Sequence, residues 1–124
     1  ASDPGLVEAS YNLAVLKGRS SSFDKEISGY LEVIELDPDF LPAQVNLAAA
    51  YCAKGMFEEA AAAAKKAIEL DPGSAEAHYT LGVACFNKGL FDEARSSYER
   101  SRELGYDPDQ AFADALTEYA KTEE

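Results

Sequence analysis

Apolar residues along this chain recur at helical spacing, and the pattern repeats after 34 residues. Within each block of that length, two separate stripes follow the i, i+3, i+4, i+7 spacing of a helix with one buried face. The two kinds of stripe are clearest as His78, Leu81, Gly82 and Cys85 in the third block, and as Phe57, Ala60, Ala64 and Ala67 in the second. Each block therefore predicts two helices, A and B, that pack against each other.

The residues between the stripes repeat as well. Lys54-Gly55 and Lys88-Gly89 separate helix A from helix B, and a glycine can take the left-handed conformation that ends a helix. Leu-Asp-Pro, at residues 36–38 and again at 70–72, ends helix B, because proline disfavours helical geometry in the residue before it. The predicted helix-turn-helix blocks are 7–40, 41–74 and 75–108.

The two ends of the chain depart from the regular block. Lys17-Gly18 stands about one turn earlier in its block than the later Lys-Gly pairs, so we expect a short first helix A and a loop over residues 18–22. Near the other end, Asp107 can cap a helix that has Pro108 at its first position. The apolar stripe of that helix is Phe112, Ala115, Leu116 and Tyr119. We predict a seventh helix over residues 108–121.

The blocks resemble the tetratricopeptide repeat, a family of 34-residue helix-turn-helix units. The third block carries the resemblance almost position by position, in AEAHYTLGVACFNKGLFDEARSSYERSREL, and the second keeps Tyr51, Ala60 and Asp71-Pro72. The first block departs from the family pattern at Ser10, Lys17, Ser21 and Glu26. The resemblance implies an all-α fold, a right-handed α-α superhelix of three repeats plus a seventh, solvating helix. It also implies one domain over residues 1–124, with the A helices lining a concave groove.

The chain is strongly acidic. Its 11 Lys and Arg residues against 23 Asp and Glu give a net charge of −12, which repels phosphate backbones and anionic lipid, so we expect neither nucleic acid nor a membrane surface as partner. The longest uncharged run, residues 40–53, is shorter than the ~18 apolar residues of a membrane-spanning helix. With no Met and no signal peptide at its start, the chain is expected to be a domain of a longer or processed protein. Its compartment is unknown, and the cytoplasm is a guess.

Candidates for chemistry are few. The single histidine, His78, falls on the inner stripe of its helix, and we interpret it as a core residue, because nucleophilic catalysis also needs a nucleophile and an orienting group. Cys52 and Cys85 form no CxxC motif and are interpreted as free thiols. No glycine-rich phosphate-binding motif follows a strand. We therefore predict no enzyme activity, no cofactor and no metal site.

Helix A of the third block carries a second apolar stripe, Tyr79, Val83 and Phe86, which at 100° per residue faces roughly away from the first. The resemblance makes that direction the concave groove. The predicted peptide-binding residues are Tyr11, Asn12, Val15, Val45, Asn46, Ala49, Tyr79, Thr80, Val83, Phe86 and Asn87. Contiguous apolar patches usually mark contact sites. The alternative is that these side chains fill space between A helices or are covered by the N-terminal residues.

We interpret the chain as a protein-interaction module that binds an extended or helical peptide segment of another protein. Family members that bind chaperone tails clamp a terminal carboxylate with Lys, Asn and Arg side chains of the three A helices. The corresponding residues here are Tyr11, Val15, Asn46, Glu76 and Thr80. Only Asn46 matches, so we expect no carboxylate clamp. The alternative function is a structural spacer or self-assembly unit of a longer scaffold protein, and homo-oligomerisation stays open.

Overall fold

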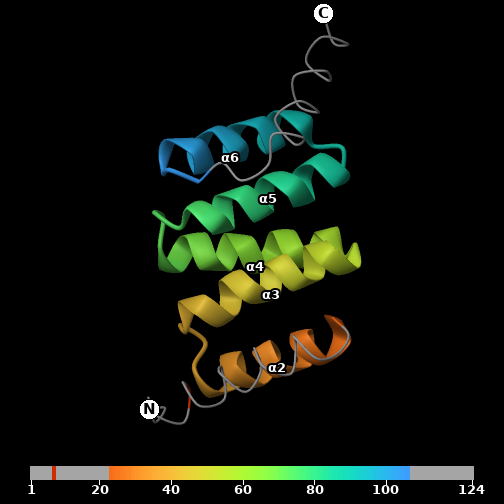
Figure 1. Ribbon diagram of the computed structural model, residues 1–124, viewed down its shortest axis with the longest axis vertical. Helices are drawn as coiled ribbons and strands as arrows, with labels where there is room; N and C mark the ends of the chain where they lie inside the picture. The colour runs from red at the N-terminus through yellow and green to blue at the C-terminus, as the bar shows by residue number, and fades with distance from the viewer. Residues whose placement is uncertain (1–6, 8–22, 107–124) are drawn as a thin grey trace, which may run out of the picture.

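The structure, a computed structural model, describes Val7 and residues 23–106. Residues 23–106 form five helices and no strand: α2 (Phe23–Leu36), α3 (Leu41–Lys54), α4 (Phe57–Leu70), α5 (Ala75–Asn87) and α6 (Phe91–Glu103). Each helix stacks on the next along one long axis (Figure 1). The all-α fold is as predicted. The first A helix, the loop over 18–22 and the helix over 108–121 lie outside the described residues.

Left-handed glycines join helix A to helix B, as the Lys-Gly pairs predict. Gly55 and Gly89 have φ values of 83° and 80°, a conformation that strains residues with a side chain. The amides that follow them, in Met56 and Leu90, donate to the carbonyl oxygen five residues earlier at 2.8 and 2.9 Å. These bonds satisfy carbonyl groups at the helix end that have no partner within the helix. Two successive repeats therefore use the same turn.

Aspartate side chains shape the turns from helix B to the next helix A. The Asp37 and Asp71 carboxylates accept hydrogen bonds from the amides two residues later, at 3.1 and 3.0 Å, so that each aspartate closes a turn on its own backbone. The α5 helix then begins with Ser74, whose Oγ accepts from the Ala77 amide at 3.4 Å. The Asp-Pro pairs thus end α2 and α4 where the sequence predicts.

One ion pair also repeats along the stack. Lys54, the last residue of α3, pairs with Asp24 at the start of α2. Lys88, which caps α5, pairs with Glu58 at the start of α4, at 3.0 Å. Each lysine therefore joins its A helix to the B helix of the preceding repeat. Because the acidic partners are exposed, each pair contributes little stability.

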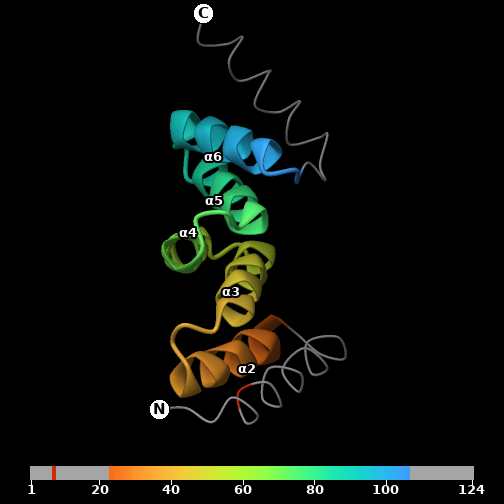
Figure 2. The same ribbon diagram turned by 90° about the vertical axis from the view of Figure 1, so that its left-hand side faces the viewer.

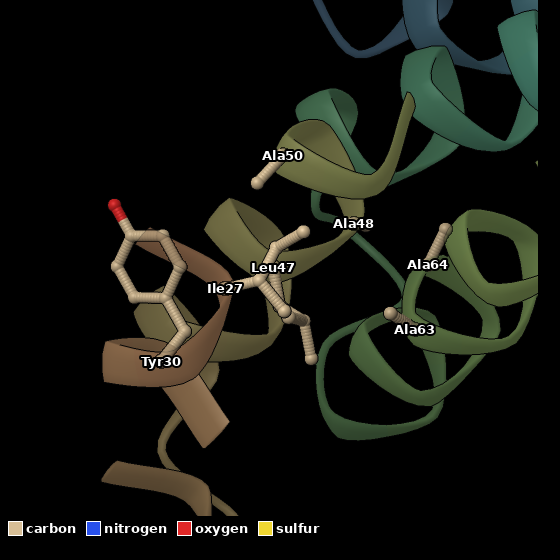
Figure 3. Packing of buried hydrophobic residues seen from close by; sticks show 7 residues of the cluster. All are labelled: Ile27, Tyr30, Leu47, Ala48, Ala50, Ala63 and Ala64. Carbon is tan, nitrogen blue, oxygen red and sulfur yellow. The ribbon is translucent and has the colours of Figure 1, made fainter. Parts of the chain in front are cut away.

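Small side chains fill the contact between α3 and α4. The α4 helix buries Ala60, Ala61, Ala63, Ala64 and Ala67. Figure 3 shows Ala63 and Ala64 opposite Leu47 and Ala48 of α3, while Ile27 and Tyr30 of α2 lie on the other side of Leu47. Since the distance between packed helices depends on the side chains at their contact, alanine on both helices lets the backbones come close.

The core is a series of clusters between neighbouring helices. Those around α3 to α6 contain Ile27, Tyr30, Leu47 and Ala64, then Ala60, Ala61 and Ala84, then Cys85, Ala94 and Tyr98. Leu81 of α5 packs against all three and so joins them into one continuous core. Burial only against neighbouring repeats is typical of a solenoid.

The close contact at Ala64 can be tested with a matched pair of substitutions. Ala64 is fully buried and Ala62, on the same helix, is exposed. Ala64→Leu should lower the free energy of unfolding by about 1–3 kcal/mol, because the added methylene groups force the helices apart. Ala62→Leu makes the same chemical change in solvent and should shift it by less than about 0.5 kcal/mol. Urea titration followed by circular dichroism measures both, and equal effects would contradict the proposed contact.

Candidate functional site

An apolar hollow of about 290 Å³ lies between α3 and α5. Figure 2 shows these two helices one above the other, with α4 set to one side of them. The hollow, called the apolar hollow below, is lined by Ala49, Cys52 and Ala53 of α3 and by Tyr79, Thr80 and Val83 of α5. Four of these six residues belong to the predicted groove, and Cys52 and Ala53 extend it along α3.

The polar groups of the apolar hollow are satisfied or neutral. Thr80 is buried, and the Cys52 Sγ lies 3.8 Å from the Thr80 carbonyl oxygen. Burial, with a smaller contribution from Cys85, raises the pKa of the Cys52 thiol to about 11. The thiol is therefore protonated at neutral pH and acts as a small apolar group. The hollow can accept an aliphatic or aromatic side chain.

A second hollow, of about 450 Å³, lies at the N-terminal ends of the same two helices. Its lining is Leu41, Pro42, Val45 and Asn46 of α3, Ser74, Ala75 and Glu76 around the start of α5, and Leu104, Gly105 and Tyr106 after α6. We call it the Glu76 hollow. It brings the predicted residues Val45 and Asn46 together with Tyr106. The helical spacing of apolar residues had not indicated Tyr106 as part of the site.

A departure from the repeat marks Tyr106. The first two blocks carry Leu-Asp-Pro at the end of helix B, whereas the third reads Leu104-Gly105-Tyr106 before its Asp-Pro. Gly105 takes a left-handed φ of 94°, and the ring of Tyr106 packs edge-on against Tyr79, with ring centroids 5.4 Å apart. Because Tyr79 also lines the apolar hollow, this ring pair connects the two hollows. Comparing the blocks with one another could have found Tyr106.

Phe86 lies away from both hollows. Its ring packs edge-on against Phe91 of α6, with centroids 5.3 Å apart, and it lines neither hollow. A rotation of 100° per residue gives the direction of a side chain around its own helix, but it does not give the distance to the next helix. Phe86 therefore could not be distinguished from the groove residues in the sequence. Phe86 instead supports the contact between α5 and α6.

The other predicted positions have local roles or lie outside the described residues. The Asn87 side chain donates to the Val83 carbonyl oxygen at 2.8 Å and so helps to end α5. Tyr11, Asn12 and Val15 fall outside the described part of the chain. Among the residues predicted for α3 and α5, the structure gathers Val45, Asn46, Ala49, Tyr79, Thr80 and Val83 around the two hollows.

The titratable side chains of the described part show no arrangement for chemistry. His78, expected in the core, is half-buried, and its Nε2 lies 3.0 Å from the Pro72 carbonyl oxygen. The pKa of Cys85 is raised by burial and then by Glu93, so its thiol is not activated as a nucleophile. Among the described residues, no group of three His, Cys, Asp or Glu side chains is placed to hold a metal, and no helix is long and apolar enough to cross a membrane.

Two family profiles match the chain, one described as TPR repeat over residues 48–89 and one as tetratricopeptide repeat over residues 75–107. Residues 48–107 belong to the tetratricopeptide repeat family. The matched residues run from within α3 to the segment after α6 and so contain most of both hollows. No match was found among curated proteins.

Several solved structures share the fold. The first TPR of Spaghetti (RPAP3), bound to the HSP90 peptide SRMEEVD, is 21% identical, with 98% of this chain and 95% of that one covered and a TM-score of 0.86. The Sgt2 TPR domain from Aspergillus fumigatus is 27% identical, with coverage of 98% and 81% and a TM-score of 0.74. The Yersinia enterocolitica type III secretion chaperone SycD, in complex with a peptide of the translocator YopD, is 17% identical, with coverage of 98% and 98% and a TM-score of 0.85.

The reactivity of the Cys52 thiol tests whether this side chain of the apolar hollow is buried. Because burial raises the pKa of Cys52 from 9.0 to about 11, the thiolate needed for alkylation is scarce below pH 9 in the folded protein. In Cys85→Ala, where Cys52 is the remaining thiol, alkylation at pH 8.5 should be at least about tenfold slower in buffer than in urea. Iodoacetamide kinetics by mass spectrometry measure this ratio.

The same shift fixes the sign of the pH dependence. The neutral thiol is present in both states below pH 9, and between pH 9 and 11 the unfolded state ionises first, so the contribution of Cys52 to stability is lost as pH rises through this range. Urea midpoints of Cys85→Ala at pH 8 and 10 should show this fall, and the variant that also carries Cys52→Ala should show a smaller one. Equal alkylation rates in buffer and urea would contradict burial of the thiol.

Proposed function

We propose that this chain is a non-enzymatic module that binds a segment of another protein through an apolar side chain seated between α3 and α5. The observation that carries the proposal is the apolar hollow, because a concave, mostly apolar site with few polar groups is typical of ligand binding. The solved relatives bound to the HSP90 peptide and to the YopD peptide are consistent with a peptide-binding role for the fold.

The distribution of charge on the two helices supports an apolar contact. Apart from His78, the charged residues of α3 and α5 are Lys54 and Glu76, at opposite ends of the groove. Lys54 already pairs with Asp24. The wall between these ends therefore loses little hydration when an apolar side chain covers it, whereas covering unpaired charges would be costly.

We further propose that the groove does not clamp a terminal carboxylate. At the clamp positions that the structure describes, Asn46 and Glu76 line the same hollow and Thr80 is buried. No lysine or arginine lines that hollow among the described residues. A carboxylate there would meet the Glu76 charge without a cation to offset it.

A substitution that fills the apolar hollow tests the proposal. Ala49 is exposed and lines the hollow, and Ala62 is exposed on α4. Linear dodecamer peptides displayed on phage can be selected on the wild-type protein and then synthesised as acetylated amides. Ala49→Gln should weaken their binding by about 2 kcal/mol, or roughly 30-fold, because the longer polar side chain occupies the space of the anchor. Ala62→Gln should leave the affinity within about twofold.

Calorimetric titration measures these affinities, and light scattering at several concentrations checks that each variant is folded and of unchanged size. Substituting Ala49 is preferred to removing Tyr79 and Phe86, whose ring contacts also hold α5 in place. Equal affinity of Ala49→Gln and wild type would move the binding site elsewhere. Tighter binding of the same peptides with a free terminal carboxylate, at a fixed internal sequence, would contradict the absence of a clamp.

A further inference from the structure

Within residues 23–106, Glu76 is an isolated negative charge at one end of an uncharged wall. It is exposed in the first turn of α5 and borders the Glu76 hollow, while α3, across that hollow, has no acidic residue. Within residues 23–106, no lysine or arginine forms an ion pair with Glu76. Its charge is therefore not neutralised by the described part of the protein.

The rest of this hollow fits a long side chain that ends in a cation. Leu41, Pro42 and Val45 form an aliphatic wall, and Tyr106 adds an aromatic ring beside Glu76. Burial, followed by the neighbouring Glu76 charge, raises the pKa of the Tyr106 phenol, so the phenol stays neutral and is close enough to Glu76 to be affected by it. Lysine and arginine place an apolar stem against such walls and a charged end against acidic and aromatic groups.

We propose that the Glu76 hollow receives a lysine or arginine side chain of the partner segment whose apolar residue occupies the apolar hollow. This inference rests on the function proposed above. Judged by their lining residues, the two hollows are about two turns apart along α3 and about one and a half turns apart along α5, or roughly 9–12 Å. An extended peptide rises about 3.3 Å per residue, so the basic residue should lie three or four positions from the apolar one.

An anion is the competing occupant, because amides at helix N-termini favour negative charge. At α5, however, the Ser74 hydroxyl already accepts from the Ala77 amide, and Glu76 supplies a negative charge in the first turn. At α3, Pro42 has no amide hydrogen to offer. The net charge of −12 also repels an approaching anion and attracts a basic segment.

The test uses the same displayed dodecamer library, which is joined to the phage through its C-terminus and so offers no free carboxylate. Selection is run on the wild-type protein, on Glu76→Gln and on Glu59→Gln. Glu59 is the matched control, because it is also exposed in the first turn of its helix and its substitution also removes one negative charge. Selected peptides are then synthesised with the basic residue replaced by norleucine, and affinities are measured by fluorescence anisotropy.

Wild-type protein and Glu59→Gln should enrich lysine or arginine three or four positions from an apolar residue, and norleucine should weaken binding about fivefold or more. In Glu76→Gln this difference should disappear while the apolar requirement stays. Raising the salt from 50 to 500 mM should shrink the preference for the basic residue.

Four outcomes would overturn the inference, and they separate it from the proposed function. Selected peptides that carry apolar anchors but show no preference for lysine or arginine would overturn the inference and leave the proposed function standing. Enrichment of acidic residues, or a basic preference that Glu76→Gln retains, would do the same. If no selected peptide binds wild type more tightly than Ala49→Gln, both the inference and the proposed function are overturned.

Discussion

The close approach of helices through alanine is the contact on which the rest of the molecule depends. The α4 helix buries five alanines against its neighbours, and the facing Ala48 and Ala84 are fully buried. Such a contact gains less from hydrophobic burial per residue than leucine packing would, but it brings backbones near and lets a 14-residue helix touch α3 and α5 at once. The spacing of the stack follows from these side chains.

The hollows are a consequence of that packing. Because α4 lies to one side of both α3 and α5 (Figure 2), these two helices face each other with small or medium side chains, Ala49, Ala53 and Val83, between them. The larger residue Leu81 is turned towards the clusters that α4 and α6 help to form. One face of α5 therefore holds the core together, and its other face, with Tyr79, Thr80 and Val83, lines the apolar hollow.

Sequence reasoning was most successful where backbone chemistry decides the structure. Glycine at positive φ and proline after aspartate restrict the chain locally, so the bounds of α3 to α5 followed from Gly55, Pro72 and Gly89. It was less successful where the distance to a neighbouring helix decides. Phe86 has the spacing of a groove residue but packs on Phe91, and His78 has the spacing of a core residue but remains half-buried beside Pro72.

Two residues of the Glu76 hollow, Glu76 and Tyr106, could have been found from the sequence by comparing the three blocks with one another. Positions that keep the repeat together recur in the second and third blocks, as the turn glycines and the lysine ion pairs do. Glu76 stands where the second block has Pro42, and Tyr106 stands where the first two blocks have Pro38 and Pro72. Tyr106 changes the turn after α6, because its amide donates to the Ser101 carbonyl oxygen at 3.0 Å, a bond that proline cannot make, and its ring packs on Tyr79. In a repeat protein, a position at which one repeat departs from the others is therefore a position at which that repeat can differ in what it binds.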